Sequence, residues 1–231
     1  MLRVLKGLLL TSFVLAIVLG VLIPLTPCSA LPLLEVSINF PSGGNISYDG
    51  AGGPLVGTGV SVDAAAGDGV AVNLAGAVLS FASGPFSGFS ANSWYFGPGG
   101  SFSIMDVDGD SALQIDPNTT LLSGSFNEAS VLQLVAIPAL GFSWDLTLGS
   151  LGDVVVNDTL LQYLGLPSGG YGGAFDLSFI GPGVQPPSGF TSRTVVRGDM
   201  LLHTPEPASL LLFGSGLAGL GLAAWRRKKS K

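Results

Sequence analysis

Apolar and polar residues alternate along several segments in the middle of this 231-residue chain. Residues 34–40 alternate in this way, and residues 142–148 and 175–179 repeat the pattern. A period of two places successive side chains on opposite faces of a strand, so each segment predicts a strand with one buried face. Weaker alternation predicts further strands at residues 60–62, 70–74, 78–81, 102–104, 113–115, 121–126, 131–135 and 194–202.

Turn-forming residues separate these segments. Residues 83–100, 167–173 and 182–189 are rich in Gly, Pro or Ser and are predicted as loops. Many short strands joined by such turns are typical of an antiparallel sheet protein. The sequence therefore predicts a mainly β domain, an antiparallel β-sandwich-like ectodomain, over residues 31–204.

One short helix interrupts the strand pattern. Residues 159–164 lack the alternation, and Asn157 or Asp158 before them is a favourable N-cap. Gly165 follows and is suited to close the helix in a left-handed conformation. We therefore predict a helix of about two turns at this position.

Composition agrees with a β-rich globular domain. The chain has 35 Gly and 15 Pro, and its residues are 47% hydrophobic and 10% charged. So much Gly is costly inside helices, which disfavours a helical bundle. The high apolar content excludes a conventional disordered chain, which is charged and poor in apolar residues.

Charges are placed unevenly along the chain. Fourteen of the fifteen acidic residues lie within residues 31–204, where Arg193 and Arg197 are the only strong bases. A nucleic-acid binder needs a basic face to neutralise phosphates. Nucleic acid is therefore excluded as a partner of this region.

The first 30 residues have the features of a secretory signal peptide. Basic residues precede an apolar run over residues 7–23, and small residues then allow cleavage between Ala30 and Leu31. Cleavage there would remove Cys28, the only Cys, so the exported chain would contain no disulfide. An uncleaved membrane anchor is the alternative interpretation.

Residues 208–225 form a second apolar run, which contains no charged residue. As a helix it would span about 27 Å, close to the hydrocarbon core of about 30 Å, and we predict a transmembrane helix. A basic tail over residues 226–231 follows at once, containing Arg226, Arg227, Lys228 and Lys229. Positively charged flanks remain cytoplasmic, so the β domain is expected to face outward.

Pro205, Glu206 and Pro207 lie between the β domain and this apolar run. The order of this tripeptide, an apolar helix and a basic tail resembles the PEP-CTERM sorting signal of bacterial surface proteins. The resemblance implies recognition by exosortase, a membrane-embedded protease that would cut near the tripeptide. It also implies an anchored stage before processing, and a cell-surface or extracellular location afterwards. The alternatives are a stiff Pro-rich spacer and a permanent membrane anchor.

Candidate catalytic residues are few. His203 is the only His, it lies two residues before Pro205, and no Cys would remain after signal cleavage. These facts argue against Ser-His-Asp catalysis, thiol catalysis and a typical zinc site. We therefore predict a non-enzymatic protein. A secreted glycosidase is the less favoured alternative, because the many acidic residues leave carboxylate pairs open.

Asp106, Asp108 and Asp110 are the best candidates for metal ligands. Carboxylates at alternate positions in a tight turn can converge on Ca²⁺, which takes six to eight oxygen ligands. The spacing resembles the front of an EF-hand loop, although Gly109 stands at the fourth position and no Glu stands at the twelfth. The competing interpretation is a hairpin turn at Asp108 and Gly109, between strands over residues 102–107 and 112–115.

Trp94, Tyr95 and Phe96 form an aromatic run before a Gly-rich stretch. Exposed aromatic faces would allow stacking on sugars, and a carbohydrate-binding module of an extracellular polysaccharide matrix is the main alternative function. Core packing at the end of a strand is the competing interpretation. The two differ in whether Trp94, Tyr95 and Trp144 are exposed.

Overall fold

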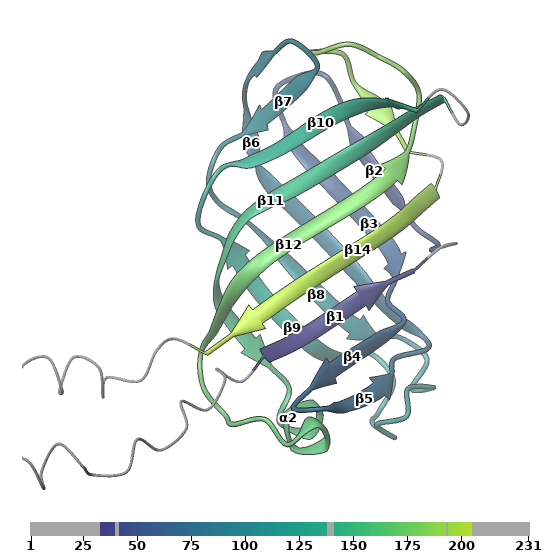
Figure 1. Cartoon of the computed structure of the whole chain (residues 1–231), viewed down its shortest axis with the longest axis vertical. Coiled ribbons are helices and arrows are strands. Elements are labelled where there is room, and N and C mark those ends of the chain that lie inside the picture. The colour runs from purple at the N-terminus through teal and green to yellow at the C-terminus, as the bar shows by residue number, and fades with distance from the viewer. Residues whose placement is uncertain (1–32, 40–41, 138–140, 193, 205–231) are drawn as a thin grey trace, which may run out of the picture. The chain divides into compact units, whose positions relative to one another are not determined.

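The computed structural model describes residues 33–39, 42–137, 141–192 and 194–204. Within these residues the strands form one hydrogen-bonded sheet in which every pairing is antiparallel, accompanied by a single short helix (Figure 1). The mainly β antiparallel fold predicted from the alternation is confirmed.

Strands follow one another along the described chain, with one helix between β11 and β12. The elements are β1 (Leu33–Ile38), β2 (Asn45–Tyr48), β3 (Pro54–Ser61), β4 (Ala64–Gly67), β5 (Val70–Asn73), β6 (Ala77–Ser90), β7 (Ser93–Phe96), β8 (Gly100–Asp106), β9 (Thr119–Phe126), β10 (Ser130–Ile137), β11 (Gly141–Val156), α2 (Asp158–Leu164), β12 (Tyr171–Ile180), β13 (Phe190–Thr191) and β14 (Thr194–His203).

The sheet closes on itself through two long strands, β6 and β11. The strand order is β13-β2-β3-β6-β7-β10-β11-β12-β14-β1-β4-β5, and β8 and β9 connect β6 to β11 by a second path. β6 pairs with β8 along its first half and with β7 along its second half. β11 likewise pairs with β10 and then with β9. The two layers seen in Figure 1, with β11, β12 and β14 crossing in front of β3 and β8, are thus joined rather than separate.

Aromatic side chains fill the core between these layers. Phe81 of β6 meets Phe126 of β9 and Phe175 of β12 edge to face, with ring centroids 6.5 and 6.2 Å apart. Trp144 of β11 stacks on Phe190 of β13 with centroids 4.4 Å apart. All five side chains are buried. Because aromatic pairs contribute beyond the area that they bury, these contacts tie together strands far apart in the chain.

The segments with the clearest alternation form the strands expected of them. In β1, Leu34, Val36 and Ile38 are buried, whereas Leu33 and Glu35 are exposed. Residues 142–148 and 175–179 lie within β11 and β12. The period of two therefore identified the strands that bury one face.

The predicted helix is also confirmed. The side chain of Asn157 caps α2 by accepting a hydrogen bond from the backbone N of Thr159 at 2.9 Å. Gly165 ends the helix with φ 69°, in the left-handed region where Gly carries little strain. Leu160 and Leu164 are buried and fix the helix to the sheet.

The prediction of a loop over residues 83–100 is wrong. β6 continues to Ser90, and β7 follows after a tight turn. The Gly, Ser and Pro residues that indicated a loop still form backbone ladders here, and Pro85 lies beside a register shift between β3 and β6. Trp94 and Phe96 are wholly buried, and their burial favours the strand.

The strand predicted at residues 113–115 is also absent from the described sheet. β8 pairs with β9, so the connection after Asp106 is a loop over residues 107–118 rather than a hairpin turn at Asp108 and Gly109. Leu113 is buried from within this loop, beside Gln114 with φ 52°. The apolar pattern that predicted a strand at residues 113–115 therefore arises from a buried Leu within a turn.

Gly173 of β12 lies opposite Leu202 of β14. A Cβ atom at this position would overlap the backbone carbonyl oxygen of Leu201. Gly169, in the loop before β12, has open space around the same position. Gly173 is therefore required by sterics, and Gly169 is not.

We expect Gly173→Ala to lower the free energy of unfolding by about 2 kcal/mol or more, because the added methyl group forces the two backbones apart. Gly169→Ala is the matched control and should change it by no more than about 0.5 kcal/mol. Urea unfolding followed by Trp fluorescence measures both. Equal unfolding midpoints for the two variants would contradict the close approach of β12 and β14.

Candidate functional site

Several predicted functional segments lie outside the described residues. They are the signal peptide over residues 1–30 with the cleavage site at Ala30 and Leu31, the sorting residues Pro205, Glu206 and Pro207, the transmembrane helix over residues 208–225, and the basic residues Arg226, Arg227, Lys228 and Lys229. In the part of the chain that the structure does describe, no helix has the length and apolar character needed to cross a membrane.

The first and last strands of the domain pair at the point where the predicted sorting segment begins. β14 ends at His203, two residues before Pro205, and Leu33 of β1 lies directly opposite His203. Opposite residues in an antiparallel ladder have Cα atoms about 4.5–5.5 Å apart. The first residue of β1 and the last residue of β14 therefore lie side by side.

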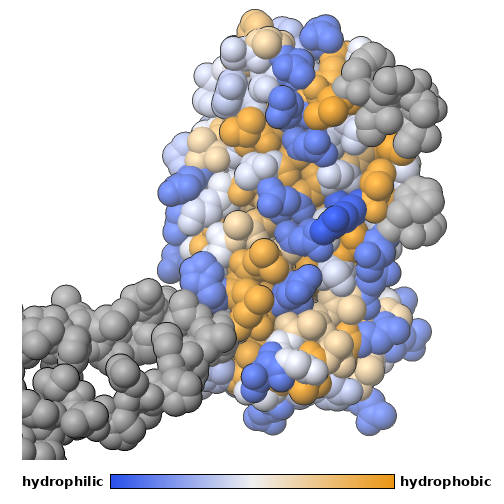
Figure 2. All heavy atoms as spheres, in the orientation of Figure 1, coloured by the Kyte–Doolittle hydropathy of each residue, from blue (hydrophilic) through white to orange (hydrophobic). Residues whose placement is uncertain are grey.

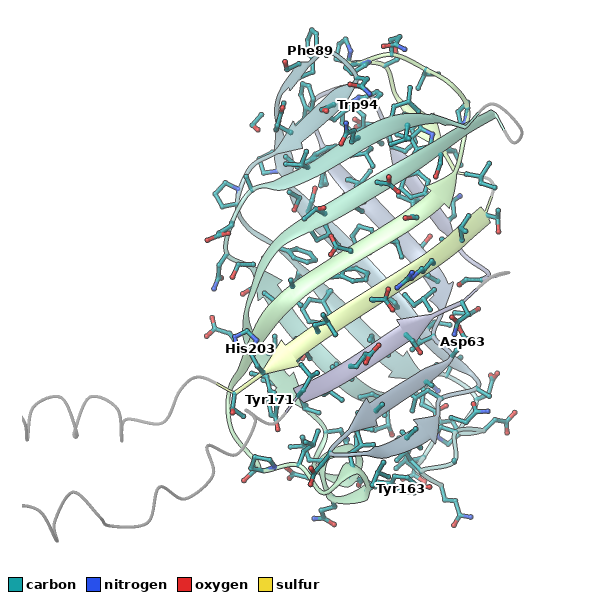
Figure 3. The ribbon with its side chains drawn as sticks, viewed as in Figure 1. Asp63, Phe89, Trp94, Tyr163, Tyr171 and His203 are labelled. Carbon is teal, nitrogen blue, oxygen red and sulfur yellow. The ribbon has the colours of Figure 1, made fainter. Side chains whose placement is uncertain are left out.

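The end of β14 has a partner strand on both sides. His203 also lies opposite Gly172 of β12, next to Tyr171 at the start of that strand. Figure 3 shows Tyr171 and His203 at the same end of the sheet. The chain is thus held in the sheet as far as His203. Thr204 alone separates the end of this strand from Pro205 in the sequence.

Tyr171 fixes the start of β12 from inside the fold. Its side chain is buried, and its hydroxyl donates a hydrogen bond to the carbonyl oxygen of Pro167 at 2.7 Å. Burial raises the pKa of the Tyr171 hydroxyl, because desolvation disfavours the charged phenolate. The phenol therefore remains a neutral hydrogen-bond donor over the ordinary pH range.

The outer face beside the end of β14 is partly apolar. Leu33 of β1 is 46% exposed, and Leu201 of β14 is 44% exposed. Figure 2 shows apolar residues on this face beside the point where the described chain ends. Two exposed Leu side chains thus lie on neighbouring strands at the end of the described chain.

The three Asp residues predicted as calcium ligands have different environments. Asp106, the last residue of β8, is wholly buried, and its Oδ1 accepts a hydrogen bond from the backbone N of Gly109 at 2.9 Å. Asp108 and Asp110 are exposed on the loop that follows. The described residues contain no group of three or more His, Cys, Asp or Glu side chains that could hold a metal ion. Calcium binding thus stays a prediction. Besides carboxylates, the ion would need further oxygen ligands.

The predicted aromatic surface is mostly part of the core. Trp94, Phe96 and Trp144 are wholly buried, and Trp94 and Trp144 contact each other with ring centroids 4.8 Å apart. Tyr95 points to the other face of β7 and is 37% exposed. Core packing is therefore the role of both Trp residues, and Tyr95 is the exposed member of the run.

Two residues of interest were not predicted from the sequence. Tyr171 lies an even number of residues before Phe175 and Leu177, so it shares their face of the strand. This spacing is a sequence signal that could have predicted its burial. Ser111 is buried in the loop after β8, and its Oγ has no hydrogen-bond partner among the described residues. No sequence pattern indicates the burial of Ser111, because it follows from the path of the loop.

Comparison with known proteins identifies the C-terminal segment. Residues 203–228 match the family described as the PEP-CTERM protein-sorting motif. The resemblance drawn from Pro205, Glu206 and Pro207 and the apolar and basic segments after them is confirmed. The motif implies export and processing by exosortase, a membrane protein. No curated protein and no solved structure matches the chain.

We expect Tyr171→Phe to lower the free energy of unfolding by about 1 kcal/mol near neutral pH, because the hydrogen bond to Pro167 is lost. The raised pKa adds a pH dependence. Its contribution is full below the unfolded pKa of about 10 and is lost as pH rises through the folded pKa. The wild-type protein should therefore lose stability above about pH 10 more steeply than Tyr171→Phe.

Urea unfolding between about pH 8 and pH 11 measures this difference. Tyr163→Phe is the matched control, because Tyr163 of α2 is exposed. It should follow the wild-type pH profile. Parallel profiles for wild type and Tyr171→Phe would show that burial does not hold the Tyr171 phenol neutral.

Proposed function

Because this chain carries a PEP-CTERM protein-sorting motif, we propose that it is a non-enzymatic protein of the cell surface or extracellular matrix. The signal peptide over residues 1–30 directs export, and the helix over residues 208–225 then holds the chain in the membrane. Exosortase cuts near Pro205, Glu206 and Pro207 and releases the β domain. The observation that carries this proposal is the match over residues 203–228.

The position of the last strand supports processing at this point. β14 ends at His203, so every described strand precedes the tripeptide in the chain. A cut near Pro207 removes no strand from the sheet and no residue from the described core. The domain is therefore expected to remain folded after its release.

The short segment after β14 supports presentation to a membrane protease. Three residues separate Thr204 from Ala208, and even fully extended the four steps between their Cα atoms span no more than about 14 Å. Pro205 and Pro207 fix φ and disfavour a helix there, which leaves an extended segment. Before processing, the tripeptide lies close to the membrane surface, where exosortase is located.

The distribution of charge supports the same orientation. The predicted helix is followed by Arg226, Arg227, Lys228 and Lys229, whereas residues 31–204 contain no Lys and two Arg. Positively charged residues next to a membrane helix remain on the cytoplasmic side. The acidic domain is consequently placed outside, where its charge favours solubility.

Extracellular polysaccharide is the proposed matrix partner, and a carbohydrate-binding module is the alternative form of this function. Phe89 and Tyr95 are 55% and 37% exposed and lie on the paired strands β6 and β7. Figure 3 shows Phe89 at the end of the sheet opposite His203. As exposed rings, Phe89 and Tyr95 support sugar stacking better than the buried Trp94 and Trp144. Because Phe89 lies opposite Trp94, it and Tyr95 are on opposite faces of the ladder, and each would stack separately.

We expect mass spectrometry of the exported protein from its source cells to find no peptides from Ala208 onward, because processing near Pro207 removes them. Glu206→Ala should restore these peptides by removing the charge between the two prolines. Glu128→Ala, which removes an exposed Glu from the β domain, is the matched control and should leave processing unchanged. Recovery of the intact C-terminal tail in surface fractions of wild-type cells would contradict processing and leave a permanent anchor.

A further inference from the structure

Asp106 is a buried carboxylate with an incomplete set of partners. Its relative exposure is 0%, and its Oδ1 accepts the hydrogen bond from Gly109. Its Oδ2 is buried and has no hydrogen-bond partner among the described residues. Burying a carboxylate oxygen without a compensating partner is costly, so an electropositive partner at Oδ2 would stabilise this position.

The described residues supply no positive charge for Asp106. The salt bridge found among them joins Arg197 to Asp199 at 2.6 Å, on strand β14. Lys is absent from residues 31–204. A cation from solution is therefore a natural partner for the Asp106 carboxylate.

A second oxygen without a partner lies in the same loop. Ser111 is 4% exposed, and its Oγ is buried with no hydrogen-bond partner in the described part of the chain. Both ends of this stretch are fixed to one turn, because Val107 N donates to Gly76 O at 3.1 Å and Ala112 N donates to Asn73 O at 3.2 Å. The residues beside Asp106 and Ser111 thus pack against the turn that joins β5 to β6.

Asp108 brings a second carboxylate to this turn. A Cβ atom placed on Gly76 would lie 3.6 Å from Asp106 Oδ1 and 3.7 Å from Asp108 Oδ2. Both carboxylates therefore lie beside Gly76. Asp108 is exposed, whereas Asp106 is wholly buried, so an ion would approach this pair from the side of Asp108. Asp110 is also exposed and is not needed in the ligand set.

We propose that the loop over residues 107–118 binds Ca²⁺ through Asp106, Asp108 and Ser111, a role independent of the sorting motif. These ligands are hard oxygens, and Ca²⁺ accepts irregular sets of six to eight oxygens that include backbone carbonyls and water. Mg²⁺ demands near-octahedral geometry and gives up its water reluctantly, so it fits an irregular loop less well. Two carboxylates give weak binding, with Kd on the order of 10⁻⁴–10⁻³ M, as in extracellular calcium modules.

The test measures the Tm of the full chain in mild detergent, in Ca²⁺ and in EGTA at matched ionic strength. Ca²⁺ at tenfold excess over Kd should raise Tm by about 3–6 °C, because it binds the folded state preferentially. Mg²⁺ at the same concentration should give a smaller rise. Equilibrium dialysis with radioactive calcium should show a bound ion under the same conditions.

Asp106→Asn should abolish both the rise in Tm and the bound calcium. Asn keeps the shape and the acceptor for Gly109 but removes the charge, so this variant should melt no lower than wild type in EGTA. Asp108→Asn changes an exposed residue, which keeps the test valid if Asp106→Asn does not fold. It should raise the calcium concentration needed for half of the Tm response several-fold.

Asp176→Asn is the matched control, because it removes the same charge from the exposed face of β12. It should keep the full calcium response. The proposal is overturned if wild-type Tm is unchanged at 10-fold excess over the expected Kd of about 10⁻³ M. It is also overturned if Asp106→Asn and Asp108→Asn keep the full response, which would show general screening of the acidic surface.

Discussion

The arrangement of the sheet depends on the pairing of β14 with its two neighbours. β14 pairs with β12 along its whole length and with β1 along its second half. β1 pairs in turn with β4, and β4 with β5, so the strand order reaches these three strands through β14. The first strand is therefore placed by the last one, a long-range contact that forms only when the domain is complete. This same pairing places Leu33 opposite His203, the last strand residue before the sorting motif in the sequence.

Burial and backbone pairing stabilise this domain, because covalent and ionic contributions are small. The only Cys, Cys28, precedes the described strands. The ion pair of Arg197 and Asp199 is largely exposed, and such pairs contribute little. Contacts such as that between Phe81 and Phe175 connect strands of the two layers instead. A domain held together in this way needs no oxidising step to stay folded.

The sequence predicted those features that depend on neighbouring residues. Alternation identified β1, β11 and β12, and the cap formed by Asn157 and Gly165 identified α2. The sorting motif was found for the same reason, since its three parts follow one another in the chain. Local composition misled where tertiary pairing prevailed: residues 83–100 contain loop-forming residues but pair with β3, β7 and β10.

The environment of Asp106 could not be predicted in this way. Its acidic neighbours were visible in the sequence, but its burial follows from pairing with Ala77 and packing against Gly76, on a turn much earlier in the chain. The hairpin expected at Gly109 gave way to a longer loop because β8 pairs with β9 instead. The burial of Asp106 and the length of this loop both follow from the register of strands distant in the chain. A single sequence does not reveal this register.

The central claim is that the β domain is complete at His203 and does not depend on the segment that directs its processing. The most direct measurement compares the Tm of the full chain with that of a chain ending at Thr204, in the same detergent and followed by Trp fluorescence. We predict that the two values agree within about 1 °C, because no described core residue lies after β14. A Tm lower by about 5 °C or more in the shortened chain would contradict this claim, because it would show that the sorting segment stabilises the fold.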